Sequence, residues 1–262
     1  MKVVLFCGGL GSRMRAHSEV IPKPLVNIEH RPILWHLMRY YAHYGHKEFI
    51  LCLGYQGNVI KDYFLNYDEC MSNDFNFSKG GKEIKLFNSD IDDWSITFVD
   101  TGLLSNLGER LSLVKEHLQG EEMFMANYTD ALSDLPLPAY IEQFKRHDAV
   151  ASIIKVQPPQ SFHAIKSDQD GFVTGFELIS DADVWINAGF MIMKNSIFDY
   201  IQPGEDLNNE PFHRLVDERK LLSYPYSGFW KPMDTYKDKK EFDLIVESGN
   251  VPWRVWDNDV QK

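Results

Sequence analysis

The feature that most constrains the fold is a short apolar run near the start of the sequence that ends in glycines. Residues Val3 to Phe6 are all large and apolar, and Gly8, Gly9 and Gly11 follow them. An unbroken run of this kind is typical of a strand buried on both faces, as in the centre of a parallel sheet. Glycines directly after the strand permit a sharp turn whose backbone N–H groups can surround a phosphate. These residues therefore predict a central parallel strand followed by a phosphate-binding turn.

Two cations and a hydroxyl follow the glycines. Ser12 supplies a hydroxyl donor and Arg13 a permanently charged fork, and both suit phosphate oxygens. Lys23 comes ten residues later, between Pro22 and Pro24. Because the prolines restrict the backbone on both sides, we expect the lysine on a stiff, extended support, aimed at one phosphate.

Two familiar phosphate-binding loops do not fit this stretch. A dinucleotide fingerprint requires a third glycine where Met14 stands, and no Walker loop spacing is present. The glycines alone are equally compatible with a strand-to-helix turn that binds nothing. Arg13 and the Pro–Lys–Pro string favour a phosphate site.

The bulk composition limits the classes of partner. The chain has 262 residues, of which 44% are hydrophobic, and its formal net charge is −11. This length suits one compact α/β domain over residues 1–262. An acidic chain is poorly suited to nucleic acid or anionic membranes, so we expect neither as a partner. A phosphate-rich substrate must then be met by local cations or by a divalent metal held on carboxylates.

Cysteine usage and the start of the sequence bear on location. Cys7, Cys52 and Cys70 are too few and too scattered for a disulfide framework or a zinc site. We find no signal peptide and no apolar run long enough to span a membrane. We therefore expect a cytoplasmic protein.

The order of predicted elements indicates a parallel, doubly wound α/β sheet. The apolar patterns predict strands at 48–53, 95–99, 122–126, 150–156 and 185–193, and helices at 32–44, 58–67, 108–118, 137–147 and 236–248. Shorter helical segments are expected at 196–200 and 211–218. Residues 68–93 predict a β-hairpin or surface excursion, 161–176 a pair of short strands, and 228–235 a loop.

Two aspartates are candidates for a shared metal site. Asp130 follows the strand at 122–126, so it should lie at the sheet edge where the glycine turn also lies. Asp234 stands in a loop among bulky and rigid neighbours. Two carboxylates at a phosphate cluster are a minimal anchor for Mg²⁺. The alternative is structural, with Asp130 in a turn and Asp234 as the N-cap of the last helix. Asp134 is a weaker rival that we expect to cap the following helix.

Together, these strings resemble the sugar-1-phosphate nucleotidyltransferases. The glycine-rich stretch from Gly8 to Arg13 and the Pro22–Lys23–Pro24 string carry the resemblance. A finer resemblance, to the glucose-1-phosphate cytidylyltransferases, extends along the whole chain. It lies at residues 32–36, 43–45, 54–64, 99–102, 156–159, 185–187, 228–230, 232–235, 247–249 and 253–256.

The resemblance implies a Rossmann-like, GT-A-like domain with a mixed, mainly parallel sheet flanked by helices. It also implies transfer of CMP from CTP to a sugar 1-phosphate, by default glucose 1-phosphate, with Mg²⁺ as cofactor and release of pyrophosphate. We further expect a homo-oligomer. On this basis the catalytic residues are Arg13 and Lys23; the nucleotide contacts are Phe6, Gly8, Gly9, Gly11, Ser12, Arg13, Lys23, Arg110 and Asp130; the Mg²⁺ ligands are Asp130 and Asp234; and the substrate contacts are Tyr128, Asn187 and Asp234.

The sequence departs from the family pattern at three places. The family usually has Gly-Asp-Gly where this chain has Thr129-Asp130-Ala131, and a second glycine where it has Glu109. A Glu-Lys-Pro motif, whose lysine binds the sugar phosphate in the family, is absent from residues 176–181. Lys166 is a possible substitute, although an exposed, solvated position suits it better.

Three functions follow for testing. The first is the cytidylyltransferase reaction on glucose 1-phosphate. The second is the same chemistry on another phosphorylated or phosphonate acceptor, or with another nucleoside triphosphate. The third is a nucleotide-binding regulatory protein with little catalysis, which the missing lysine favours and the presence of Arg13, Lys23, Asp130 and Asp234 opposes.

Overall fold

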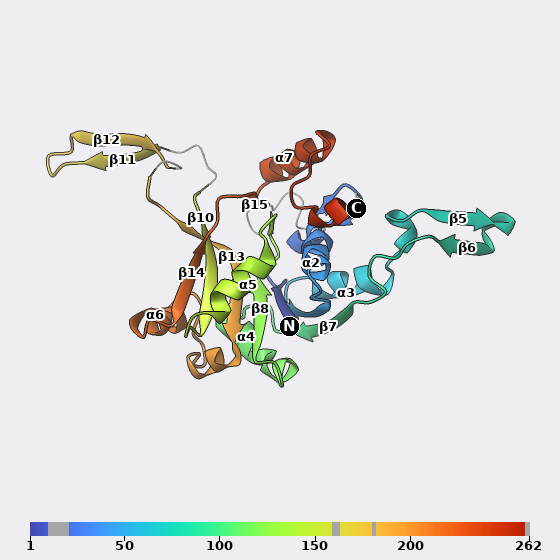
Figure 1. Ribbon diagram of the computed structural model, residues 1–262, viewed down its shortest axis with the longest axis horizontal. Helices are drawn as coiled ribbons and strands as arrows, with labels where there is room; N and C mark the ends of the chain where they lie inside the picture. Colours follow the sequence, from blue (N-terminus) through green and yellow to red (C-terminus); the bar gives the residue numbers. More distant parts are fainter. Residues whose placement is uncertain (10–20, 159–162, 180–181, 260–262) are drawn as a thin grey trace.

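A seven-stranded sheet forms the centre of the molecule in the computed structural model, which describes residues 1–9, 21–158, 163–179 and 182–259 (Figure 1). The strand order is β14-β10-β13-β8-β1-β4-β7. Only β13 runs antiparallel to its neighbours, so the predicted mixed, mainly parallel α/β sheet is confirmed. The strands are β1 (Val3–Phe6), β4 (Glu48–Leu53), β7 (Ser95–Asp100), β8 (Met123–Asn127), β10 (Ala151–Val156), β13 (Ile186–Lys194) and β14 (Leu221–Pro225).

Strand β1 is central and parallel, as its apolar run predicts. It pairs with β4 on one side and β8 on the other, and all four of its side chains are buried. Val3 and Leu5 belong to one core cluster, whereas Val4 and Phe6 belong to a second cluster on the opposite face. The continuous apolar run therefore follows from burial on both faces of the sheet.

Helices cover both faces of the sheet. One face packs against α2 (Ile33–His43), α3 (Gly57–Leu65), α5 (Leu137–Lys145) and α7 (Tyr236–Glu247). The other packs against α4 (Leu107–Leu113), α6 (Glu210–Asp217) and the 3-10 turns η5 (Lys115–Leu118) and η6 (Asn195–Asp199). The remaining 3-10 turns are η2 (Lys23–Leu25), η3 (Glu69–Met71), η4 (Lys79–Gly81) and η7 (Val255–Asp259). Among the described helices, none has the length and apolar character needed to cross a membrane.

Helix α2 carries a buried histidine that joins it to the C-terminal part of the chain. His36 Nε2 lies 3.1 Å from the carbonyl oxygen of Ile28, and its Nδ1 accepts a hydrogen bond from Trp253 Nε1 at 3.4 Å. These partners suit the neutral ring protonated on Nε2. Burial lowers the pKa of His36 to about 4, although its contacts with backbone carbonyls partly oppose this.

We expect His36 to make the fold sensitive to acid. Between pH 6.5 and pH 4 the unfolded chain binds a proton at this position and the native chain does not, so stability falls as the pH falls. The full effect is about 3 kcal/mol. In urea unfolding, His36→Gln should lose less stability across this window than the unmodified chain. His46, whose pKa is also lowered to about 4 by burial, contributes equally to both proteins. Equal losses in the two proteins would contradict the assignment.

Two β-hairpins project from opposite sides of the body (Figure 1). One consists of β5 (Phe75–Ser78) and β6 (Glu83–Leu86), and the other of β11 (His163–Ser167) and β12 (Val173–Leu178). Both were expected from the sequence, at 68–93 and 161–176. Each exposes large apolar side chains, including Phe77 and Phe87 on the first and Phe172 and Phe176 on the second.

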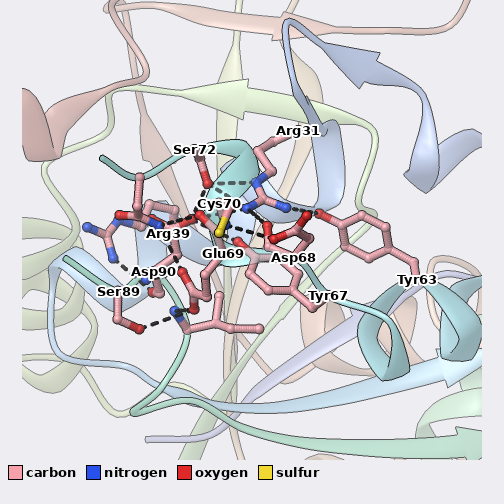
Figure 2. Close-up of polar contacts among 12 residues, drawn as sticks. Arg31, Arg39, Tyr63, Tyr67, Asp68, Glu69, Cys70, Ser72, Ser89 and Asp90 are labelled. Carbon is pink, nitrogen blue, oxygen red and sulfur yellow. Dashed lines mark hydrogen bonds and ion pairs between the residues drawn. The ribbon is translucent and has the colours of Figure 1, made fainter. Parts of the chain in front are cut away.

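A buried ion pair anchors the β5–β6 hairpin to the body (Figure 2). Arg31 Nη2 lies 3.4 Å from Asp90 Oδ2, and both residues are buried. Tyr67 donates a hydrogen bond of 2.9 Å to the same carboxylate, and the Arg31 guanidinium carbon lies 4.1 Å from the centre of the Tyr67 ring. The backbone N–H of Asp90 donates to Glu69 Oε2 at 2.8 Å. These contacts fix both ends of the excursion.

The prediction missed several short strands. Strand β14 was not predicted, and the segment expected as a loop contains β15 (Trp230–Pro232), which pairs with β9 (Ala131–Ser133). A two-stranded sheet of β2 (Asn27–Ile28) and β3 (Arg31–Pro32) was also missed. The helix expected at 108–118 is instead two pieces, because α4 ends at Leu113 and η5 follows.

Candidate active site

Three charged side chains meet at the edge of the sheet where β1 and β8 end. Lys23 Nζ donates hydrogen bonds of 2.8 Å to Asp130 Oδ2 and 2.6 Å to Asp234 Oδ1. The lysine side chain is 15% exposed, so the pairs are partly shielded from solvent. The structure thus brings together three of the sequence-predicted residues from positions far apart in the chain.

A short antiparallel pair places the two aspartates. In the β9–β15 ladder, Pro232 lies opposite Ala131, and the backbone N–H of Met233 donates to the carbonyl of Asp130 at 2.7 Å. Each aspartate adjoins this pairing, so backbone hydrogen bonds fix their relative positions.

The structural alternative for Asp234 is wrong. Thr235 is the N-cap of α7, in a capping box with Asp238. The expectation for Asp134 is also wrong, because Pro136 stands at the N-cap of α5 and Asp134 accepts a hydrogen bond from the Tyr226 hydroxyl.

Lys23 lies on a rigid support, although not the extended one expected. Pro22 is extended, with φ −63° and ψ 144°, and Lys23 begins the 3-10 turn η2. Burial alone lowers the pKa of Lys23, but the two carboxylates more than offset this and raise it above its ordinary value. Lys23 is therefore a permanent cation at this position.

The first glycine of the predicted phosphate turn makes room for a buried arginine. A Cβ on Gly8 would lie 2.1 Å from Arg110 Nη1, and one on Gly54 would lie 2.9 Å from the same atom. Arg110 donates to the carbonyls of Gly8 and Leu53 at 3.2 Å each, and to Thr101 Oγ1 at 2.7 Å. Burial lowers its pKa. Arg110 therefore supports the turn from behind, in addition to the nucleotide contact expected of it.

A cavity of about 390 Å³ lies beside the glycine turn. Phe6, Gly8, Gly9, Arg110 and Tyr128 line it, together with residues 103–107 and Asp206. Four predicted nucleotide contacts and one predicted sugar contact thus border one hollow. Gly11, Ser12 and Arg13 lie outside the described residues, so their predicted roles stay predictions.

The residue before Asp130 has an unusual backbone. Thr129 has φ +65° and is 2% exposed, although left-handed backbone is unfavourable for a β-branched residue. Its Oγ1 donates to the carbonyl of Phe6 at 3.0 Å, and its N–H donates to Asn127 Oδ1 at 3.2 Å. Where the family usually has glycine, this chain has a threonine in the left-handed conformation, hydrogen-bonded to the end of β1.

We expect substitutions of Thr129 to separate the cost of its left-handed backbone from the contribution of its side-chain hydrogen bond. Thr129→Gly removes a backbone strain of roughly 1–2 kcal/mol and loses a hydrogen bond of about 1 kcal/mol, so stability should change little. Thr129→Val keeps the strain and loses the bond, and should destabilise the fold by about 1–2 kcal/mol. Urea unfolding measures both variants. A Val variant as stable as the Gly variant would show that the left-handed backbone carries no strain, and a Val variant as stable as the unmodified chain would show that the hydrogen bond contributes nothing.

The predicted sugar contacts form one hydrogen-bonded group. Asn187 Nδ2 donates to the Tyr128 hydroxyl at 3.1 Å, and that hydroxyl donates to Asn208 Oδ1 at 2.9 Å. Asn187 Oδ1 accepts from the N–H of Gly189 at 2.9 Å. Gly189 has φ +83°, and a Cβ there would lie 2.6 Å from the Tyr128 ring. Burial raises the pKa of Tyr128, so its hydroxyl stays protonated.

The structure resolves two of the sequence departures. Glu109 forms a capping box with Asn106 at the start of α4, so its carboxylate stabilises a helix end. Lys166 lies on the exposed β11–β12 hairpin and pairs with Glu177 at 2.9 Å. It therefore has the exposed role that suited it better from the sequence.

Asn208 and the strained backbone of Thr129 were not predicted from the sequence. Asn208 comes from the segment before α6, and no local pattern marks it. The Thr129 position was visible as a departure from the family's glycine, which is the signal for a left-handed backbone.

The oxygen donors at this edge suit a hard cation. Asp130 and Asp234 already converge on one ammonium group, and Mg²⁺ requires only one or two carboxylates because water and phosphate complete its shell. In the described ranges, no group of three or more His, Cys, Asp or Glu side chains forms a closed metal site. The arrangement therefore fits a metal that arrives with phosphate.

Comparison with known proteins identifies relatives along nearly the whole chain. The model of the nucleotidyl transferase family matches residues 2–235. A glucose-1-phosphate cytidylyltransferase of Salmonella typhi is 38% identical over 259 residues, covering 98% of this chain and 100% of the relative. The enzyme of that name from Salmonella typhimurium is 37% identical with the same coverage. The crystal structure of UDP-glucose pyrophosphorylase complexed with UDP-glucose has the same fold, with a TM-score of 0.68 at 14% identity over 95% of this chain and 98% of that one.

Proposed function

The chain belongs to the nucleotidyl transferase family, and on that premise we propose that it transfers CMP from CTP to glucose 1-phosphate, giving CDP-glucose and pyrophosphate. An oxygen of the acceptor phosphate forms a bond to the α-phosphorus of CTP. The bond from that phosphorus to the oxygen shared with the β-phosphate breaks. Because the attacking phosphate oxygen is already ionised, the enzyme needs mainly to align the reactants and neutralise charge.

We assign to Lys23 the role of neutralising the negative charge that grows on the α-phosphate during the reaction. Its ammonium lies at the edge of the sheet where the glycine turn begins and donates two short hydrogen bonds to Asp130 and Asp234. The raised pKa keeps it protonated at any working pH. Arg13 is assigned the leaving pyrophosphate on the sequence resemblance.

Asp130 and Asp234 are assigned to hold Mg²⁺. When bound, Mg²⁺ neutralises phosphate charge at this edge. Both carboxylates are partly exposed, so a cation that arrives with the nucleotide can reach them from solvent. We expect Lys23 to turn from the carboxylates toward the α-phosphate when the nucleotide and its metal arrive.

The cavity beside Gly8 and Gly9 is assigned to the nucleotide, and the group of Tyr128 and Asn187 to the sugar. The ring centres of Phe6 and Tyr128 lie 6.3 Å apart, so the proposed positions of the nucleotide and the sugar are neighbours at the cavity wall. Asp234 serves both the metal and the acceptor in this proposal. In this proposal the α-phosphate lies near Lys23, between the nucleoside and the sugar.

The observation that carries the proposal is the identity to glucose-1-phosphate cytidylyltransferases over 98% of the chain. Pyrophosphate release tests it, with CTP, UTP, dTTP and GTP each offered together with glucose 1-phosphate and Mg²⁺. We expect release with CTP and at least tenfold less with the other triphosphates. Release from UTP or dTTP alone would overturn the nucleotide assignment. Release only with another phosphorylated acceptor would favour the same chemistry on that acceptor, and no release with any would favour a regulatory role.

We further propose a cytoplasmic location and a homo-oligomer. The three cysteines are unpaired, as suits a reducing compartment. The exposed apolar side chains of the two β-hairpins are suited to contact between copies of the chain.

A further inference from the structure

The acceptor phosphate needs a cation that the family motif does not supply in this chain. The Glu-Lys-Pro lysine is absent from the sequence, and Lys166 is 71% exposed and paired with Glu177. Near the sheet edge, Lys23 is shared between two aspartates, and Lys231 pairs with Glu241. Within the part of the chain that the structure describes, we therefore looked for a further cation for a sugar phosphate that sits beside Asn187. This inference rests on the proposed function.

Lys155 lies next to Asn187 at this edge. It stands near the carboxyl end of β10, which runs in the same direction as β1 and β8, so it belongs to the edge where ligands bind in open α/β sheets. In the antiparallel β10–β13 ladder, Lys155 is directly opposite Asn187. Directly opposed residues point to the same face of a sheet, so the two side chains share one face.

An aromatic side chain holds the Lys155 ammonium. Its Nζ lies 4.8 Å from the centre of the Trp185 ring, and Trp185 precedes Asn187 by two residues. The Trp185 ring is itself fixed by a hydrogen bond of 3.0 Å from Nε1 to Asp183. Among the described residues, no carboxylate pairs with Lys155. A cation held by a ring keeps its three N–H donors for an anion.

A cavity lies beside Asn187, the residue opposite Lys155 in the ladder. Ile153, two residues earlier on β10, lines a hollow of about 400 Å³ together with Asn187 and Asn208. Asn187 and Asn208 are both hydrogen-bonded to the Tyr128 hydroxyl. These hydrogen bonds lead from Asn187, the residue opposite Lys155, to the loop that carries Asp130.

We propose that Lys155 binds the phosphate of the acceptor, in place of the lysine missing from the family motif. The Trp185 ring holds the ammonium beside Asn187, and the phosphate of glucose 1-phosphate lies between Lys155 and the metal-binding aspartates. The lysine contacts substrate and takes no part in proton transfer. Discrimination between phosphorylated and neutral sugars follows from this contact.

The test compares Lys155→Met with Lys166→Met, in the full chain with CTP and glucose 1-phosphate. Methionine keeps the apolar stem and removes the charge. We expect Lys155→Met to raise KM for glucose 1-phosphate at least about tenfold, because a hydrogen bond to a charged group is lost, and to change KM for CTP less than twofold. Lys166→Met should match the unmodified chain. Lys155→Arg should recover part of the lost affinity, since it restores the positive charge on a guanidinium group of different shape.

Each other result overturns the inference. An unchanged KM for glucose 1-phosphate in Lys155→Met would show that another cation binds the acceptor, while the proposed function stands. Equal increases in both KM values would show a nucleotide or structural role. No pyrophosphate release by the unmodified chain with glucose 1-phosphate would refute the proposed function itself, and the inference with it. Thermal unfolding of each variant checks that the fold is retained.

Discussion

Asp234→Asn should abolish nucleotidyl transfer while leaving the fold intact. The change keeps the shape of the side chain and removes one of the two negative charges that converge at the edge of the sheet. A neutral amide binds Mg²⁺ weakly, and catalysis in this proposal depends on neutralising phosphate charge. We expect kcat to fall at least a thousandfold, the upper part of the range for loss of one such electrostatic contact. Steady-state pyrophosphate release measures it, with unfolding in urea as the check on stability.

Asp243→Asn is the matched control for this variant. Asp243 lies on α7 and pairs with Lys239 one turn away, outside the proposed site. The same chemical change there should leave kcat unchanged. An active Asp234→Asn variant would remove Asp234 from the metal assignment. Loss of activity accompanied by unfolding would assign the residue a structural role.

Lys23→Ala should lower kcat about a hundredfold, with a much smaller change in the binding of CTP. The positive charge of Lys23 meets a phosphate whose negative charge grows in the transition state, so its removal costs on the order of 3 kcal/mol at that stage. Full kinetic curves in CTP and glucose 1-phosphate separate the two effects.

The structure adds a second consequence for this variant. Lys23→Ala removes the ammonium that competes with Mg²⁺ for the carboxylates of Asp130 and Asp234, so this variant should need less Mg²⁺ for half-maximal rate than the unmodified chain. An unchanged kcat with a raised KM for CTP would show that Lys23 only binds the nucleotide. A raised requirement for Mg²⁺ would contradict the shared position of the three groups.

Local patterns in the sequence predicted most of the fold. The apolar run of β1 indicated burial on both faces, and helical spacing located α2, α5 and α7 to within about two residues. Strand β14 was missed because it is half-buried and ends in a proline, so it has neither an unbroken apolar run nor a clear alternation. Strands β9 and β15 have three residues each, and only their pairing makes them strands.

The candidate site was predictable where a motif carries the chemistry. Lys23 was predicted at a phosphate and the two aspartates at a shared metal site, but the short β9–β15 pair that brings Asp234 to Asp130 depends on tertiary structure. Lys155 had no distinguishing pattern, since it is one charged residue in a mainly apolar strand. Its significance comes from its register opposite Asn187, which only the folded sheet defines.

The most direct test of the proposed function is ³¹P nuclear magnetic resonance of the purified protein with CTP, glucose 1-phosphate and Mg²⁺. We predict two coupled phosphorus signals of a nucleoside-diphosphate sugar that grow in step with pyrophosphate. With the Asp234→Asn variant in place of the unmodified protein, these signals should be absent. Release of CMP in place of the coupled product, or an unchanged spectrum with the unmodified protein, would contradict the transfer of CMP to glucose 1-phosphate.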